Sequence, residues 1–176
     1  MLRMNRENEE DVLLRAAESL CIAARTAPKG KGRDLICTLI ASGPDKDMLV
    51  HKMREIAKRE GVPSFERDAG NIESCRLLVL IGTAKKALGL KFCGFCGFAD
   101  CAEMEKQGGS CAYNSGDLGI AVGSAVSRAA DLRLDNRIMY TAGKAALELD
   151  FFPEEIAIAL GIPLCVTGKS PFFDRV

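Results

Sequence analysis

The sequence predicts a mixed helix and sheet (α+β) fold in which helices cover a central sheet. Segments with apolar residues at helical spacing outnumber the extended apolar runs along the chain. The two clearest extended runs, LICTLIAS and CRLLVLIGT, are apolar at nearly every position, which is typical of strands buried on both faces. With 176 residues the chain is long enough to bury a core. We therefore expect a single domain over residues 1–176.

The first half of the chain predicts a helix, a strand and a second helix. Alanine and leucine recur at helical spacing over residues 8–27, after an acidic start, and Pro28 ends this helix. The strand follows the basic loop KGKGRD and covers residues 35–42. Asp45 is typical of a helix N-cap, and Gly61 of the end of that helix.

The second half predicts a strand, three helices and a last strand around a cysteine-rich loop. FERDAGNIES carries acidic residues and glycine, and we expect it to be irregular. The elements expected after it are a strand at 75–83, a helix capped by Ser115 that reaches Arg133, helices at 136–149 and 153–160, and a strand at 162–167.

Composition excludes several kinds of partner. The 24 basic residues balance the 24 acidic ones, so no overall charge attracts nucleic acid or an acidic membrane surface. No stretch approaches the roughly 20 apolar residues that a membrane span needs. The N-terminus is charged and lacks an apolar run. We expect a cytoplasmic protein that binds neither nucleic acid nor membrane, and whose thiols stay reduced.

Half of the eight cysteines lie in the short segment 92–111, FCGFCGFADCAEMEKQGGSC. Their spacing is C-x2-C-x4-C-x9-C, and they are Cys93, Cys96, Cys101 and Cys111. Two cysteines separated by two residues reach one metal centre only where the chain turns tightly, and Gly94 and Gly97 permit such turns. In a reducing compartment the pattern indicates a metal site rather than disulfides.

The spacing leaves the metal open. Four thiolates hold either a tetrahedral zinc ion or an iron–sulfur cluster. Zinc sites usually consist of two separated C-x2-C pairs, whereas here one pair precedes two single cysteines, which favours a [4Fe–4S] cluster. A disulfide or a redox-active cysteine set is a third alternative. The other cysteines lie in apolar patterns and are expected to be buried hydrophobes, although Cys75 or Cys165 is an alternative to Cys111 as the fourth ligand.

The cysteine segment resembles the short four-iron–four-sulfur domain of electron-transfer subunits in anaerobic metabolism. The pattern C-G-x-C-G-x-x-x-C-x-x-[FM]-A of that domain is matched by Cys93, Gly94, Cys96, Gly97, Cys101 and Met104. The resemblance implies a [4Fe–4S] cluster and electron transfer.

Two short motifs resemble the flavin-dependent nitroreductases. An alanine–proline turn with basic residues precedes the first strand, and Leu160 to Pro163 read L-G-I-P before the last one. The resemblance implies a nitroreductase-like central sheet, FMN whose phosphate is held by basic residues, and a homodimer. The basic residues at the corresponding place in this chain are Arg25, Lys29, Lys31 and Arg33. Considered without the resemblance, the loop 29–33 is either an anion site or a solvated turn.

Over nearly its full length the chain resembles bacterial and archaeal proteins described as uncharacterised proteins containing a ferredoxin domain. The matching stretches are AARTAPKGKGRD, CGFCGFADC, DLGIAVGSAV, DNRIMYTAG and GIPLCVTGKSPFFDR. The resemblance implies a cluster without specifying a reaction or a redox partner. We therefore expect an iron–sulfur protein that transfers electrons, with or without flavin chemistry. The alternative is a zinc-stapled interaction module.

Overall fold

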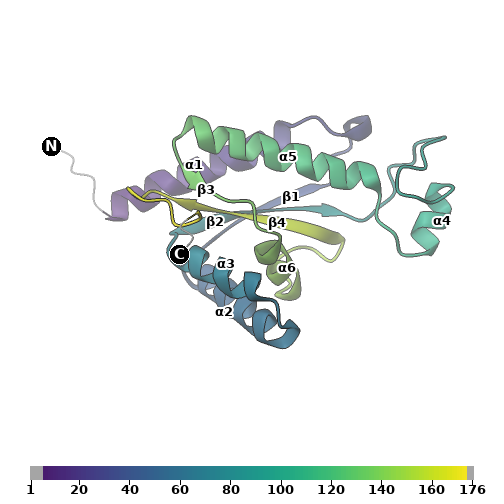
Figure 1. The fold of residues 1–176 in the computed structure, drawn as a ribbon. Coiled ribbons are helices and arrows are strands. Elements are labelled where there is room, and N and C mark those ends of the chain that lie inside the picture. Colours follow the sequence, from purple (N-terminus) through teal and green to yellow (C-terminus); the bar gives the residue numbers. More distant parts are fainter. Residues whose placement is uncertain (1–5, 174–176) are drawn as a thin grey trace.

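The structure is a computed structural model that describes residues 6–173 (Figure 1). Asp174 and Arg175, which end the last motif quoted above, lie outside this range. The elements in chain order are α1 (Arg6–Thr26), a 3-10 turn η1 (Gly30–Gly32), β1 (Ile36–Ser42), α2 (Gly43–Glu60), α3 (Pro63–Glu73), β2 (Leu77–Ala84), α4 (Cys101–Lys106), α5 (Ala112–Asp131), β3 (Asp135–Asn136), α6 (Tyr140–Glu148) and β4 (Ile156–Cys165).

The strands form one antiparallel sheet with the order β1-β2-β4-β3. Strand β2 is central, and each of its eight residues is buried. In β2, Leu80 lies opposite Leu39 of β1, and Leu77 lies opposite Leu164 of β4. The predicted class, a mixed helix–sheet fold with a covered central sheet, is confirmed.

Helices cover both faces of the sheet. Figure 1 shows α1 and α5 side by side on one face, and α2, α3 and α6 on the other. The alternation of side chains along a strand sends Val79 and Ile81 of β2 into the α1–α5 layer, and Leu78 and Leu80 into the layer of α2, α3 and α6. The sheet therefore lies between two apolar cores.

The segment FERDAGNIES is helical, so the prediction of an irregular stretch is wrong. Pro63 starts α3, where its missing N–H costs no hydrogen bond. Phe65, Ala69 and Ile72 follow at helical spacing and are all buried against the core. The polar residues between them face outward, apart from Asp68, whose Oδ2 accepts a hydrogen bond from Thr141 Oγ1 at 2.7 Å.

The prediction of a helix at 153–160 is also wrong, because most of this stretch belongs to strand β4. Residues 156–164 pair with β2 along its whole length, and Gly161 exchanges two backbone hydrogen bonds with Met139 on the other side. A short apolar run fits either a buried strand or a helix. Here the pairing with the central strand makes it a strand. The predicted strand at 162–167 is the second half of β4.

Further boundaries differ from the prediction. Helix α2 begins at Gly43 with Ser42 at the N-cap position, so Asp45 lies in the first turn and is not the N-cap. Helix α5 begins at Ala112, three residues before Ser115, and the helix predicted at 136–149 divides into β3 and α6. Helix α6 approaches β4 so closely that a Cβ at Gly143 would overlap the carbonyl group of Ala159. Within residues 6–173, no helix combines the length and the apolarity that crossing a membrane requires.

Candidate metal centre

The cysteine segment leaves the sheet at the end of β2 and returns to it through α5. In Figure 1 it projects beyond the sheet, with α4 at its tip. The segment has its own small apolar cluster, made by the buried residues Leu88, Met104 and Cys111 with partly buried neighbours that include Phe98 and Tyr113. The core strand β2 and the long helix α5 thus hold both ends of the segment.

All four predicted cysteine ligands line one cavity of about 350 Å³. Cys111 is buried, with 8% of its surface exposed, and Cys93, Cys96 and Cys101 are half-buried. The rest of the wall is mainly apolar, with Leu88, Met104 and backbone of the cysteine loop. Sites for small ligands have a similar size and lining. The structure therefore brings together the set of cysteines that the spacing predicts.

Positive φ angles make the turns between the cysteines. Gly94 and Gly97 have φ values of 66° and 85°, as their placement predicts, and the Gly97 N–H donates to the Gly94 carbonyl at 3.0 Å. Phe92 adopts φ 53° without being glycine, which is uncommon for a bulky side chain. Local strain just before Cys93 indicates a backbone held in place by its surroundings.

The short helix α4 carries the third cysteine, and a capping box holds its first turn. Asp100 accepts a hydrogen bond from the Glu103 N–H at 2.8 Å, and Glu103 accepts one from the Ala99 N–H at 3.0 Å. Met104 on this helix is fully buried. A Cβ at Gly109 would lie 2.7 Å from the Phe98 ring, so glycine lets the returning chain pack closely. The sequence analysis did not predict α4.

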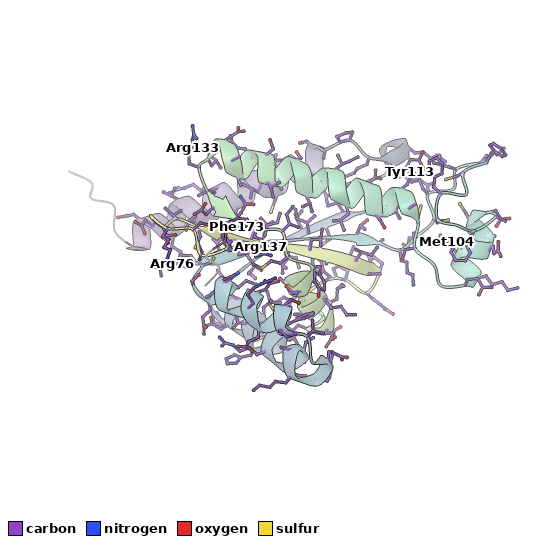
Figure 2. The ribbon with its side chains drawn as sticks, viewed as in Figure 1. Arg76, Met104, Tyr113, Arg133, Arg137 and Phe173 are labelled. Atoms are coloured by element: carbon purple, nitrogen blue, oxygen red, sulfur yellow. The ribbon has the colours of Figure 1, made fainter. Side chains whose placement is uncertain are left out.

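Two contacts attach the segment to α5. Asn114 is buried, and its Nδ2 donates to the carbonyl oxygens of Ala84, at 3.1 Å, and of Lys86. The rings of Phe95 and Tyr113 stack with centroids 6.0 Å apart and planes at 11°. Figure 2 shows Tyr113 near the end of α5 and Met104 in α4 beyond it. These contacts position the cysteine loop relative to the sheet.

The four thiols line one cavity and are not gathered around a single point. Among the described residues, no three histidine, cysteine or acidic side chains are placed to share a single metal ion. Four thiolates on zinc would each lie about 2.3 Å from the same point. The four cysteines instead line a cavity, and thiolates are ligands of iron–sulfur clusters as well as of zinc. The N-terminus of α5, beside Cys111, adds a positive dipole end near these thiolates.

Cys75 and Cys165 lie elsewhere. Their Sγ atoms are 3.2 Å apart, and both line a different cavity, which shares no residue with the cysteine segment. Cys111 therefore lies with Cys93, Cys96 and Cys101, whereas Cys75 and Cys165 do not. Of the remaining cysteines, Cys21 and Cys37 are half-buried, and burial raises the pKa of both thiols.

The predicted flavin-phosphate residues all have partners within the chain. Lys29 Nζ donates to three carbonyl oxygens at the end of α1, at 2.7 to 3.1 Å, and Arg25 pairs with Asp34 at 2.9 Å. Lys31 and Arg33 contact the carbonyl oxygens of residues 89 and 88, at 3.4 and 3.5 Å. The basic loop therefore lies against the start of the cysteine segment.

Asp117 of α5 holds the basic loop. Its two carboxylate oxygens accept from the Gly30 N–H at 3.0 and 3.1 Å, and the side chain is buried. A groove of about 470 Å³ lies between this loop, Phe95, Tyr113 and the exposed Ile120. The roles of Asp117 and Asn114 were not predicted, although two polar residues on the inner face of an apolar helix indicate such contacts.

The fold is that of the nitroreductases. It is similar to a nitroreductase with bound FMN from Desulfitobacterium hafniense, with 16% identity, a TM-score of 0.61 and coverage of 95% of this chain and 81% of that one. It is also similar to nitroreductase CinD from Lactococcus lactis in complex with nicotinic acid, with 13% identity, a TM-score of 0.61 and coverage of 98% and 86%. The class is thus a nitroreductase-like fold with a cysteine-lined cavity.

Sequence relatives specify the family. An uncharacterized protein of Archaeoglobus fulgidus is 39% identical over 169 residues, which is 91% of this chain and 90% of that protein. The family described as "uncharacterized protein containing a ferredoxin domain" matches residues 107–175. The chain belongs to this family, as the sequence motifs indicate.

Proposed function

We propose that this protein transfers electrons through a [4Fe–4S] cluster bound by Cys93, Cys96, Cys101 and Cys111. The observation that carries the proposal is the single cavity that all four side chains line. The ferredoxin-domain family and the nitroreductase-like fold both support a redox role. When bound, such a cluster supplies transfer of single electrons.

The residues around the cavity contribute in three ways. The mainly apolar wall, with Leu88 and Met104 buried, limits access of water to the site, and solvent access is one determinant of cluster potential. Glycines beside the cysteines leave backbone amides open to approach by the sulfur atoms. The half-buried Cys93 and Cys96, next to the exposed Phe92 and Phe95, place one side of the cavity near the surface. An electron partner would approach that side.

Metal and sulfide analysis of protein purified without oxygen tests this proposal. We expect about four irons and four acid-labile sulfides per chain, and a brown absorption that bleaches on reduction. A colourless protein with one zinc per chain would instead support the zinc-stapled module, and would overturn the cluster.

A bound flavin is a second candidate. The relatives in fold include an oxidoreductase containing FMN, with 14% identity, a TM-score of 0.59 and coverage of 93% of this chain and 67% of that one. The groove between the basic loop and the Phe95–Tyr113 stack is mainly apolar, which suits a planar ring. Lys31 and Arg33 are more available for a phosphate than Lys29, which is buried and bonded to three carbonyl oxygens. We expect FMN added to the purified protein to lose fluorescence on binding, and an unchanged signal would exclude this site.

A further inference from the structure

A second pair of thiols lies at the other end of the sheet. Cys75 lies two residues before β2, and Cys165 is the last residue of β4. Cys75 Sγ donates to Cys165 Sγ at 3.2 Å, and each residue is 3% exposed. In Figure 2, Arg76 marks this end of the molecule, across the sheet from Met104 in the cysteine segment. The pair is therefore separate from the candidate metal centre and needs its own explanation.

The two sulfur atoms are close enough to react with one another. A disulfide bond is about 2.05 Å long, so the two sulfur atoms need to move together by little more than 1 Å when an oxidant takes up two electrons and the thiol protons leave. The backbone already holds Cys75 just before β2 and Cys165 at the end of the neighbouring strand β4, with Leu77 opposite Leu164. Cys75 also contacts the Asn71 carbonyl at 3.2 Å, which ties it to the end of α3.

The pair divides into a nucleophile and a hydrogen donor. The hydrogen bond from Cys75 lowers the pKa of Cys165, although burial and Asp135 of β3 act against this. The same hydrogen bond and burial raise the pKa of Cys75, with Lys46 of α2 acting in the opposite direction. A lowered pKa increases the fraction of thiolate, which is the form that attacks a disulfide.

A polar cavity of about 670 Å³ gives access to the pair. Both cysteines line it, together with charged groups from three elements and the chain around them. Lys46 is itself buried, with 9% of its surface exposed, and its Nζ lies 3.4 Å from the Glu73 carbonyl oxygen. The cavity is large enough for a small polar molecule.

We propose that Cys75 and Cys165 form a reversible dithiol–disulfide couple that exchanges electrons with a small disulfide-containing molecule in this cavity. The Cys165 thiolate attacks one sulfur of the incoming disulfide, so that a mixed disulfide forms and the first thiolate leaves. Cys75 then attacks Cys165 Sγ, closes the protein disulfide and releases the second thiolate, which takes the proton of the Cys75 thiol. The two cysteines lose two electrons, and the incoming disulfide gains them.

The test uses full-length protein, purified without oxygen, and bis(2-hydroxyethyl) disulfide as the probe. After incubation, acid quenching and alkylation of free thiols, trypsin yields Cys75 within peptide 68–76 and Cys165 within peptide 145–169. We expect these two peptides to be joined by a disulfide that is lost on adding reduced dithiothreitol. Cys75→Ser should instead retain a mixed disulfide at Cys165, and Cys165→Ser should form neither product.

Cys21→Ser and Cys37→Ser are matched controls, because both positions are half-buried and far from the pair in sequence. Both should form the Cys75–Cys165 bond at the wild-type rate. The proposal is overturned if folded wild-type protein forms no such bond, or if Cys21 and Cys37 take up the probe as fast as Cys165. If the serine variants fail to fold, the result for the wild-type protein alone tests the proposal. A protein without the cluster should still form the Cys75–Cys165 bond, so a failure of the cluster proposal can be distinguished from a failure of this one.

Discussion

At the scale of single residues, Asn114 connects the core to the candidate metal centre. Its amide donates to two carbonyl oxygens at the exit of β2, and it lies three residues after Cys111. Replacement by alanine leaves both carbonyl groups without this partner in a buried environment. We expect Asn114→Ala to lower the free energy of unfolding by about 1–3 kcal/mol.

Urea unfolding measures this change as a lower midpoint at unchanged slope. Ser127→Ala, at an exposed position of the same helix, is the matched control and should leave the midpoint in place. Equal midpoints for the wild type and Asn114→Ala would show that the hydrogen bonds contribute nothing to stability.

Some residues of the candidate site can be predicted from the sequence, and others cannot. Gly94 and Gly97 are predictable because the spacing of the cysteines itself requires tight turns, and both have positive φ. Asn114 and Asp117 are not, because their partners are 28 to 87 residues away in the sequence. Which loop carbonyl or amide comes to lie beside a helix depends on the folded chain, and no local pattern contains it.

At the scale of elements, the contact between α6 and β4 depends on Gly143. A side chain there would overlap the backbone of Ala159, and backbone cannot move aside as a flexible side chain can. Overpacking of this kind typically costs about 1–3 kcal/mol. We expect Gly143→Ala to lower the thermal midpoint by several degrees.

The exposed neighbour Lys144→Ala serves as the control, measured by the same thermal scan. It should unfold within about a degree of the wild type, because surface substitutions rarely change stability. If Gly143→Ala were as stable as Lys144→Ala, the close packing of α6 on β4 would be contradicted.

Two arginines of α2 form ion pairs with the neighbouring helices. Arg54 contacts Glu73 of α3 at 2.7 Å, and Arg59 contacts Glu148 of α6 at 2.9 Å. Hydrogen bonds from the arginines lower the pKa of both glutamates below the ordinary 4.5. The unfolded chain then binds more protons than the folded one near and below pH 4.5, so this stabilisation is lost as the pH falls through that range.

Thermal midpoints measured between pH 6 and pH 3 test this dependence. Glu73 is exposed and Glu148 is partly exposed, so we expect a small effect that 1 M salt reduces. Glu148→Gln should flatten the fall in midpoint relative to the wild type, while Glu154→Gln, whose carboxylate has no such pair among the described contacts, should not. Parallel curves for all three proteins would rule out the ion pair as a source of acid sensitivity.

Elements with strong, continuous patterns are predictable, and those with ambiguous ones are not. The core strand β2 and the helices α1 and α2 follow from apolar runs, helical spacing and the glycine or proline at their ends. The helix α3 was not predicted because its acidic and glycine residues are typical of loops, although Phe65, Ala69 and Ile72 have helical spacing. For β4, pairing with β2 overrides a local pattern that fits a helix equally well.

At the scale of the whole molecule, the class of fold is predictable but the order of the strands is not. Apolar runs without alternation indicate strands covered on both faces, and the structure has a layer of helices on each face (Figure 1). The order β1-β2-β4-β3 brings β4 next to β2 across the cysteine segment, α5 and α6. Such long-range pairing leaves no mark in the local sequence.

The outer face of α5 leads us to propose a homodimer, which the nitroreductase resemblance implies. Gly116, Gly119 and Gly123 have open space beside them, and Ile120 among them is 48% exposed. Small residues permit close approach of a second helix. We expect the wild type to sediment as a dimer, and Gly119→Arg to sediment as a monomer.

Gly119→Ala is the matched control, because it changes the same position but adds only a methyl group, and it should remain dimeric. Analytical ultracentrifugation at several concentrations distinguishes these states. A wild type that is monomeric throughout, or a Gly119→Arg variant that remains dimeric, would contradict the use of this face.

The central claim, that one cavity-lining set of cysteines binds one cluster, is tested most directly by measuring iron and sulfide in single cysteine variants. The account predicts about four irons and four sulfides per chain in the wild type, and strong loss in each serine variant of Cys93, Cys96, Cys101 and Cys111. Cys75→Ser and Cys165→Ser should keep the wild-type content, since both residues line a different cavity. Full content in Cys111→Ser together with loss in Cys75→Ser or Cys165→Ser would contradict the assignment.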